Sequence, residues 1–175
     1  MKIHITGNAG SGKTTLSKRL SKRIKLPSYG LDKVVWKENW MKTDSNERAI
    51  EEKKLVQKSE WVIEGVSKEI RRAADFVIFI DRNPFHCVIR ALIRSIPFLT
   101  KSRPELPNNC PELKIIPYTI KLIFHFNRNA RKTILDDITS KPHKILRTDR
   151  EIKVFLETVS KSKEQLFLQT KGQKK

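Results

Sequence analysis

The sequence is poor in cysteine and glycine and has no long apolar runs, and these shortages exclude several classes of protein. Its two cysteines, Cys87 and Cys110, form no CxxC pattern, so we expect two reduced thiols in a cytoplasmic protein rather than a disulfide framework or a thiolate metal site. An apolar run such as FVIFI at 76–80 is far shorter than the roughly 20 residues of a membrane-spanning helix. The N-terminus also lacks the pattern of a secretory signal.

Acidic residues are scarce relative to basic ones. The chain has 37 lysines and arginines against 19 aspartates and glutamates, a formal net charge of +18. Such a field attracts polyanions, including nucleotides, nucleic acids and anionic lipids. The sequence contains no RNP-type aromatic motif, zinc-finger spacing or basic-zipper heptad. The charge therefore fits a generally basic surface as well as it fits a dedicated DNA-binding face.

Short apolar segments alternate with longer segments of helical periodicity. We predict strands at 2–6, 61–65, 76–81 and 143–148. We predict helices between the glycine-rich stretch and Pro27, at 43–58, at 84–96, at about 118–139 and at about 149–168, followed by a polar end. Five of the eight prolines lie between 97 and 117, so that stretch is predicted to be irregular. The alternation predicts one α/β domain over 1–175 with a mainly parallel sheet.

Three of the six glycines lie within six residues, in the stretch GNAGSGKT at 7–14. This is the P-loop pattern, and it stands between a predicted strand and a predicted helix, as the motif requires. Its glycines let successive backbone amides turn toward one anion, and the helix N-terminus adds to the positive field. We expect Lys13 to reach the β- and γ-phosphates and Thr14 to ligate Mg²⁺. The predicted phosphate-binding residues are Gly7, Asn8, Ala9, Gly10, Ser11, Gly12, Lys13, Thr14 and Thr15.

The class of P-loop protein is narrowed by what surrounds the motif. No NKxD guanine-reading motif occurs, which argues against a GTPase, and the chain is short for a large AAA+ or helicase motor. The form GxxGxGK[ST] is common among small-molecule kinases related to adenylate and shikimate kinases. We therefore expect a three-layer α/β/α fold with a five-stranded sheet, and ATP with Mg²⁺ as its ligands.

Three carboxylates are candidates for chemistry at this site. Asp32 in YGLD could orient or deprotonate an acceptor hydroxyl, or act as an N-cap or a solvated aspartate. Glu64 and Asp81 each end a predicted strand on the edge of the sheet that carries the P-loop. We expect only one of them to serve the metal, and we favour Glu64.

Arginines flank the start of the proline-rich stretch. Arg90 and Arg94 are four residues apart, so they project from one face of the predicted helix, and Arg103 follows. Arginines on a lid can close over transferring phosphates and stabilise their charge, although a solvated basic face would have the same composition. Trp36 and Trp40 are also four apart beside Asp32, and they could wall an acceptor pocket or serve as core.

The chain resembles the adenylate-kinase-like P-loop proteins known as DNA topology modulation (FlaR-like) proteins. The resemblance rests on GNAGSGKTT, LDKVVWKENW, WVIEG, the strand ending in Asp81 and SRPELPNNCPE at 102–112. It implies a kinase-like core with ATP and Mg²⁺, a small acceptor-binding insertion at about 31–60 and a lid at about 95–117. The family name refers to DNA supercoiling, not to a chemical reaction.

Two functions from different classes remain open at this stage. The first, which we prefer, is an ATP- and Mg²⁺-dependent phosphotransferase acting on a small-molecule acceptor, with Lys13, Asp32, Arg90, Arg94 and Arg103 as catalytic residues. The second is a nucleotide-binding regulator that associates with DNA through its basic surface. A regulator of that kind would not need Asp32 or the lid arginines.

Overall fold

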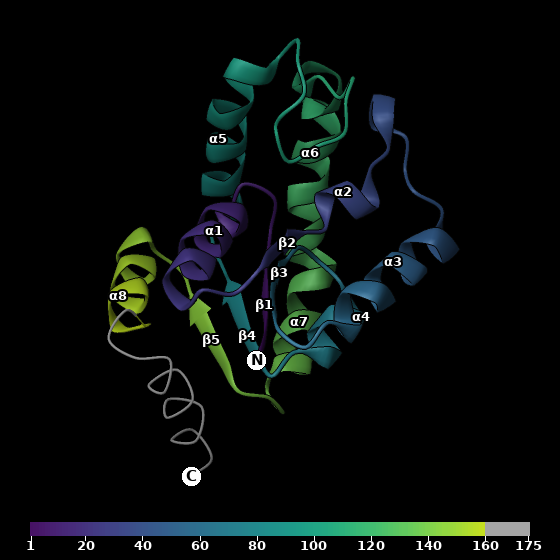
Figure 1. Ribbon diagram of the computed structural model, residues 1–175. Helices are drawn as coiled ribbons and strands as arrows, with labels where there is room; N and C mark the ends of the chain where they lie inside the picture. The colour runs from purple at the N-terminus through teal and green to yellow at the C-terminus, as the bar shows by residue number, and fades with distance from the viewer. Residues whose placement is uncertain (160–175) are drawn as a thin grey trace.

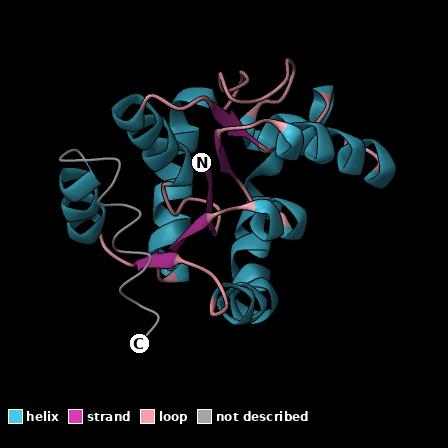
Figure 2. Ribbon diagram, turned by 60° about the horizontal axis from the view of Figure 1, so that its bottom comes forward, coloured by secondary structure: helices cyan, strands magenta, loops and turns pink. Residues whose placement is uncertain are grey.

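The computed structural model describes residues 1–159, which form a parallel sheet between two layers of helices (Figures 1 and 2). The strands are β1 (Lys2–Gly7), β2 (Ser28–Gly30), β3 (Trp61–Glu64), β4 (Phe76–Ile80) and β5 (His143–Leu146). They lie in the order β2-β3-β1-β4-β5, and all four pairings are parallel. The three-layer α/β/α fold with a five-stranded parallel sheet, as predicted from the sequence, is confirmed.

The helices fill the connections between the strands. The α-helices are α1 (Lys13–Ile24), α2 (Asp32–Val35), α3 (Ser45–Gln57), α4 (Lys68–Ala73), α5 (Pro84–Ser95), α6 (Glu112–His125), α7 (Arg131–Ile138) and α8 (Asp149–Val159). Two short 3₁₀ helices, η1 (Glu38–Trp40) and η2 (Ile96–Phe98), and a π-helical turn, η3 (Phe126–Ala130), complete the set. Among residues 1–159, no helix is long and apolar enough to span a membrane.

The central strands are buried on both faces, which explains their unbroken apolar sequences. On one face, Ile3, Ile78 and Ile80 pack under α1 and α8. On the other face, Val77 and Phe79 pack under α4, η3 and α7. Side chains alternate between the faces of a strand, so FVIFI supplies both cores at once. The two cores fix the sheet, and with it the edge at which the P-loop lies.

The structure differs from the sequence-based predictions at four places. Strand β2 was not placed by the sequence, because a three-residue edge strand carries no apolar period. Helices α2 and α4 are likewise short, and neither was predicted. The long helix predicted from about 118 begins instead at Glu112, and its path turns through the π-helical η3 before α7. The predicted helix beyond Val159 and the polar end lie outside the described residues.

The sequence predicted that this helix begins at about 118 because residue 117 is a proline. It stands inside α6, where proline removes one backbone hydrogen bond and is normally disfavoured. The residue whose carbonyl loses its partner, four positions earlier, is Leu113, which is 62% exposed. The proline therefore removes one hydrogen bond from the first turn of α6, at an exposed residue.

We predict that Ile78→Ala destabilises the protein by about 2–5 kcal/mol, since Ile78 is fully buried in the sheet and truncation leaves a cavity. The matched control is Ile89→Ala on α5, whose side chain is 55% exposed and whose loss we expect to change stability by about 0.5 kcal/mol or less. Urea unfolding curves measure both. Equal losses in the two variants would contradict the two-faced core described above.

Candidate active site

The loop between β1 and α1 curls tightly, and its glycines make this possible. Gly10 has a φ of +73°, and a Cβ placed on it would lie 2.2 Å from the Cys87 carbonyl oxygen of α5. Gly12, with a φ of +101°, caps α1 without any side-chain hydrogen bond to the first turn. The loop thus presents a helix N-terminus whose amides are not bonded by a capping side chain, the arrangement that binds phosphate.

Side chains from distant helices hold this loop in place. Asn8 donates through Nδ2 to the Ile123 carbonyl of α6 at 2.9 Å. The buried Arg82 donates through Nε to the Ser11 carbonyl, also at 2.9 Å. Arg82 was not among the predicted site residues, and its only sequence signal is its place directly after Asp81, the residue that follows β4. These two bonds anchor the loop to α6 and to the end of β4 without using its backbone amides.

A second arginine joins this support. Arg90 donates through Nε to the Gly10 carbonyl at 3.2 Å and lies 3.4 Å from the Asp149 carboxylate at the start of α8. Asp149 also pairs with Arg82, and that hydrogen bond lowers the pKa of the Asp149 carboxyl. Arg90 therefore contacts the P-loop as part of an ion-pair network that ties α8 to it, and its predicted role at the transferring phosphates stays a prediction.

Lys13, the lysine of the motif, bends back over the loop. Its Nζ donates to the Asn8 carbonyl at 2.8 Å. Burial lowers the pKa of the Lys13 ammonium, and the carboxylates of Glu64 and Asp32 oppose that change. An anion placed beside Lys13 would favour its charged form in the same way as these carboxylates do.

Thr14 and Glu64 lie together at the end of β3. The Thr14 hydroxyl donates to Glu64 Oε1 at 2.9 Å, and Glu64 is 5% exposed. Burial raises the pKa of the Glu64 carboxyl, with Lys13 opposing. A hydroxyl and a buried carboxylate are the hard oxygen ligands that Mg²⁺ prefers, and a cation there would offset the cost of burying the charge. The residues present therefore fit a magnesium ion.

Asp81, the competing carboxylate, is engaged elsewhere. Both of its oxygens accept hydrogen bonds from Arg131, at 2.7 and 2.9 Å, and Arg147 lies 3.6 Å away. Two guanidinium partners already compensate its charge. The arrangement therefore favours Glu64 over Asp81 as the metal ligand.

His4 supports the same strand end from inside the sheet. It is fully buried, and burial lowers its pKa to about 3, so the ring is neutral at pH 7. Its Nε2 lies 3.1 Å from the Gly65 carbonyl, and a neutral ring donates to that oxygen from Nε2. The contact fixes the residue that follows Glu64. His4 therefore has a positioning role at this strand end.

The lid segment carries a buried ion pair next to Asp32. Arg103 donates through Nε to Glu112, and both side chains are buried; Glu112 also accepts from the Ser95 hydroxyl at 2.8 Å. Arg103 Nη2 lies 3.9 Å from Asp32 Oδ2. Glu112 thus aims Arg103 at Asp32. Glu112 was not among the predicted site residues, because the sequence gives no sign of which carboxylate a lid arginine will meet.

Arg94 enters the same space without a partner. Burial lowers its pKa, and the nearby Arg103 lowers it further. Its Nε is buried and has no hydrogen-bond acceptor within residues 1–159. A buried donor left without an acceptor is costly, so this guanidinium is suited to an anionic ligand.

Two cavities meet at these residues. The larger, of about 780 Å³, lies over the P-loop between α1, α5 and the lid and includes Thr15 and Arg90. The smaller, of about 100 Å³, lies between α2, the end of β3 and α6 and includes Asp32 and Glu64. Both cavities are lined by Lys13, Thr14, Arg94 and Arg103. These four shared residues lie where the cavity over the P-loop meets the cavity beside Asp32.

Aromatic side chains close the smaller cavity. Trp36 makes edge-to-face contacts with Trp40 and Tyr118, at centroid distances of 5.4 and 6.0 Å. Trp40 also donates through Nε1 to the Pro111 carbonyl at 2.9 Å. The tryptophans therefore line the cavity and also join the segment at 31–60 to α6.

Glu112 provides a test of the buried lid pair. Glu112→Gln should destabilise the protein by about 3–5 kcal/mol, because it leaves Arg103 buried without its anionic partner. The control is Glu105→Gln, which breaks the partly exposed pair of Glu105 with Lys18 and should cost about 1 kcal/mol or less. Urea unfolding at neutral pH measures the difference. If Glu112→Gln costs no more than the control, the lid pair does not hold the lid.

Three solved structures resemble this chain in fold. A shikimate kinase from Bacteroides thetaiotaomicron shares 16% identity, covering 92% of this chain and 97% of that one, with a TM-score of 0.55. For a shikimate kinase from Acinetobacter baumannii the identity is 14%, the coverage 99% and 95%, and the TM-score 0.55. A deoxyadenosine kinase from M. mycoides shares 14% identity, covering 90% of this chain and 98% of that one, with a TM-score of 0.51. At these identities the likeness concerns the fold.

No curated protein matches the sequence, so the resemblance to FlaR-like proteins stays a prediction. A family model described as "AAA domain" (AAA_18) matches residues 3–93, from β1 into α5. The match says nothing about assembly, and the expectation that the chain is too short for a large motor also stays a prediction. Because the matched region is more than half of the 175 residues, the chain belongs to the AAA domain family AAA_18.

Proposed function

We propose that the protein is an ATP- and Mg²⁺-dependent phosphotransferase that acts on a small-molecule acceptor. One observation carries this proposal: the cavity over the P-loop and the cavity beside Asp32 meet at Lys13, Thr14, Arg94 and Arg103. A kinase needs a donor compartment and an acceptor compartment that meet at cationic groups, because transfer depends on positioning and charge stabilisation.

The donor side is formed by the P-loop. Backbone amides of the loop at 7–15 and the Lys13 ammonium bind the phosphates, and Arg82 keeps the loop in shape through its bond to the Ser11 carbonyl. Thr14 and Glu64 would hold Mg²⁺, which when bound neutralises charge on the phosphate oxygens. The Thr14–Glu64 hydrogen bond keeps the two oxygen ligands together in the absence of the ion.

The acceptor side is formed by Asp32 and the lid. Asp32 accepts the proton of an acceptor hydroxyl, and the Arg103 guanidinium lies 3.9 Å from its carboxylate. Arg94, with its unpartnered donor, binds the transferring phosphoryl group together with Arg103, and Arg90 acts from the donor side. The acceptor-binding insertion at 31–60 and the lid at 95–117 are the segments that would move to admit ligands.

We expect Lys13→Ala to abolish ATP binding, whereas Asp32→Asn keeps ATP binding and lowers transfer by about 10²–10⁴-fold, the usual contribution of a general base. Calorimetry with an ATP analogue measures binding. ADP formed above the acceptor-free background, with ATP, Mg²⁺ and a panel of small acceptors, measures transfer. A wild-type chain that transfers to no acceptor in a broad panel would oppose the proposal, and full transfer by Asp32→Asn would remove that residue from catalysis.

The two strand-end carboxylates are separable by experiment. Glu64→Gln should weaken the Mg²⁺ dependence of ATP binding while retaining a hydrogen bond to Thr14. Asp81→Asn should leave that dependence unchanged and reduce stability instead, because Arg131 loses its anionic partner. Calorimetric titration of the ATP analogue with and without Mg²⁺, together with urea unfolding, provides the comparison. The reverse pattern would assign the metal to Asp81.

The DNA-binding regulator predicted as an alternative rests on the net charge of +18. No feature of the described residues singles out one face for a duplex, so this alternative stays a prediction.

A further inference from the structure

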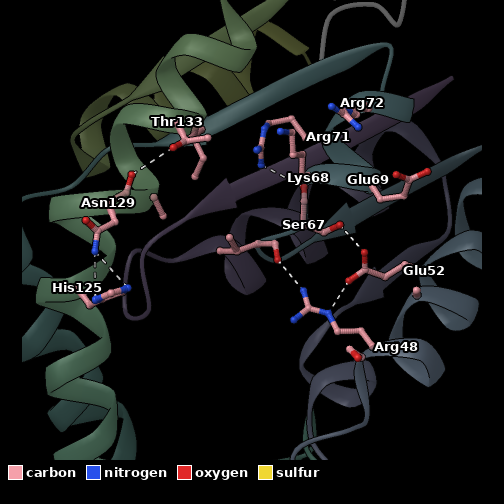
Figure 3. A pocket seen from close by; sticks show the side chains of 15 residues that line it. Arg48, Glu52, Ser67, Lys68, Glu69, Arg71, Arg72, His125, Asn129 and Thr133 are labelled. Atoms are coloured by element: carbon pink, nitrogen blue, oxygen red, sulfur yellow. Dashed lines mark hydrogen bonds and ion pairs between the residues drawn. The ribbon is translucent and has the colours of Figure 1, made fainter.

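A third cavity lies apart from the two that form the candidate active site. It has a volume of about 670 Å³, is bounded by α3, α4 and the path from the end of α6 to α7, and shares no lining residue with the other two. In Figure 3, Arg48, Ser67 and Lys68 stand on one side of the opening, and His125, Asn129 and Thr133 stand on the other. A cavity of several hundred Å³ is the usual size for a small-molecule site.

Cations outnumber carboxylates on its walls. Arg48, Lys68, Arg71 and Arg72 line the cavity with Glu52 and Glu69. The buried Arg71 is compensated by Asp137 from outside the cavity, and Arg48 by Glu52. Within residues 1–159, Lys68 and Arg72 form no ion pair and are exposed. Glu69 on the wall is likewise outside any ion pair of the described residues. The walls thus carry four cations against two carboxylates, and this excess of positive charge favours an anion.

The opposite wall is made by the π-helical turn η3. Such turns are rare and occur frequently at functional sites. Asn129, within the turn, has its amide nitrogen 3.2 Å from Nδ1 of His125, the residue just before it. Both side chains are exposed and present hydrogen-bonding groups opposite Lys68. Ala49, Val66 and Ile134 supply apolar surface between the two polar walls.

We infer that this cavity binds a small organic phosphate. Lys68 and Arg72 bind the phosphate group, because an exposed ammonium and guanidinium that form no ion pair within residues 1–159 favour a compact anion of high charge. His125 and Asn129 bind hydroxyl groups of the ligand, and the apolar surface contacts its carbon skeleton. The inference does not depend on the proposed phosphotransfer, since no residue of the cavity belongs to the candidate active site.

The cavity is joined to the candidate active site through the segment after Glu64. Arg48 donates through Nη2 to the Val66 carbonyl at 3.0 Å, and the Ser67 hydroxyl donates to Glu52 at 2.5 Å. Val66 and Ser67 therefore lie between the proposed metal ligand and the cavity.

The test is calorimetric titration of the full chain with ribose 5-phosphate, with ribose as the neutral probe. The titration uses Lys13→Ala, in which the P-loop no longer binds anions, and separately wild type saturated with a non-hydrolysable ATP analogue and Mg²⁺. We expect saturable binding of ribose 5-phosphate in both and none of ribose. The double variant Lys68→Gln/Arg72→Gln should weaken binding about tenfold or more, since it removes two charge-assisted contacts.

The matched control is Lys121→Gln/Lys132→Gln, which removes the same charge from exposed lysines outside the cavity and should leave binding unchanged. Equal weakening by both double variants would show that net charge alone attracts the ligand, and it would overturn the site. Failure of ribose 5-phosphate to bind either form would overturn it too. Neither result would bear on phosphotransfer, which is measured separately as ADP formation.

Discussion

The contact between the P-loop and α5 is the constraint on which the rest of the structure depends. Gly10 lies so close to the Cys87 carbonyl that no side chain fits between them, so the loop and the helix must be placed together. Arg90 on the same helix bonds to the Gly10 carbonyl. Since Arg94 follows one turn later, the packing that shapes the phosphate loop also sets where the lid arginine projects. The packing of α5 against the P-loop therefore determines both the shape of the loop and the position of Arg94.

Some charged side chains at the candidate active site have close partners of opposite charge, and others do not. Asp81, Glu112 and Arg82 have close partners of opposite charge, so they hold the structure. Glu64 and Lys13 are disfavoured in their charged forms by burial, and Arg94 has a buried donor without an acceptor. A nucleotide with its metal would offset these deficits, because it brings a cation to Glu64 and anions to Lys13 and Arg94. The uncompensated groups are thus those suited to ligands.

The P-loop and the carboxylates at the strand ends could be predicted from sequence, because their signals are local: a fixed spacing of glycines and a polar residue that ends an apolar run. The choice between Glu64 and Asp81 could not be made firmly from sequence, since it depends on Arg131, which is 50 residues away from Asp81 along the chain. The partnership of Arg103 with Glu112 and the support of the loop by Arg82 were missed for the same reason. Pro117 misled the placement of α6, because proline normally marks a helix boundary whereas α6 continues through it.

Four consecutive residues connect the chemistry to the rest of the molecule. Glu64 faces Thr14, the Gly65 carbonyl contacts the His4 ring, Val66 accepts from Arg48, and Ser67 bonds to Glu52. The first two contacts involve the core strand and the P-loop helix, and the last two involve α3 of the segment at 31–60. A displacement of α3 would therefore shift Val66, which is two residues after the proposed metal ligand Glu64. His4 is buried and neutral, and its contact with the Gly65 carbonyl holds this segment in place. The segment from Glu64 to Ser67 therefore links the candidate active site to the third cavity, and a ligand in one would affect the other through it.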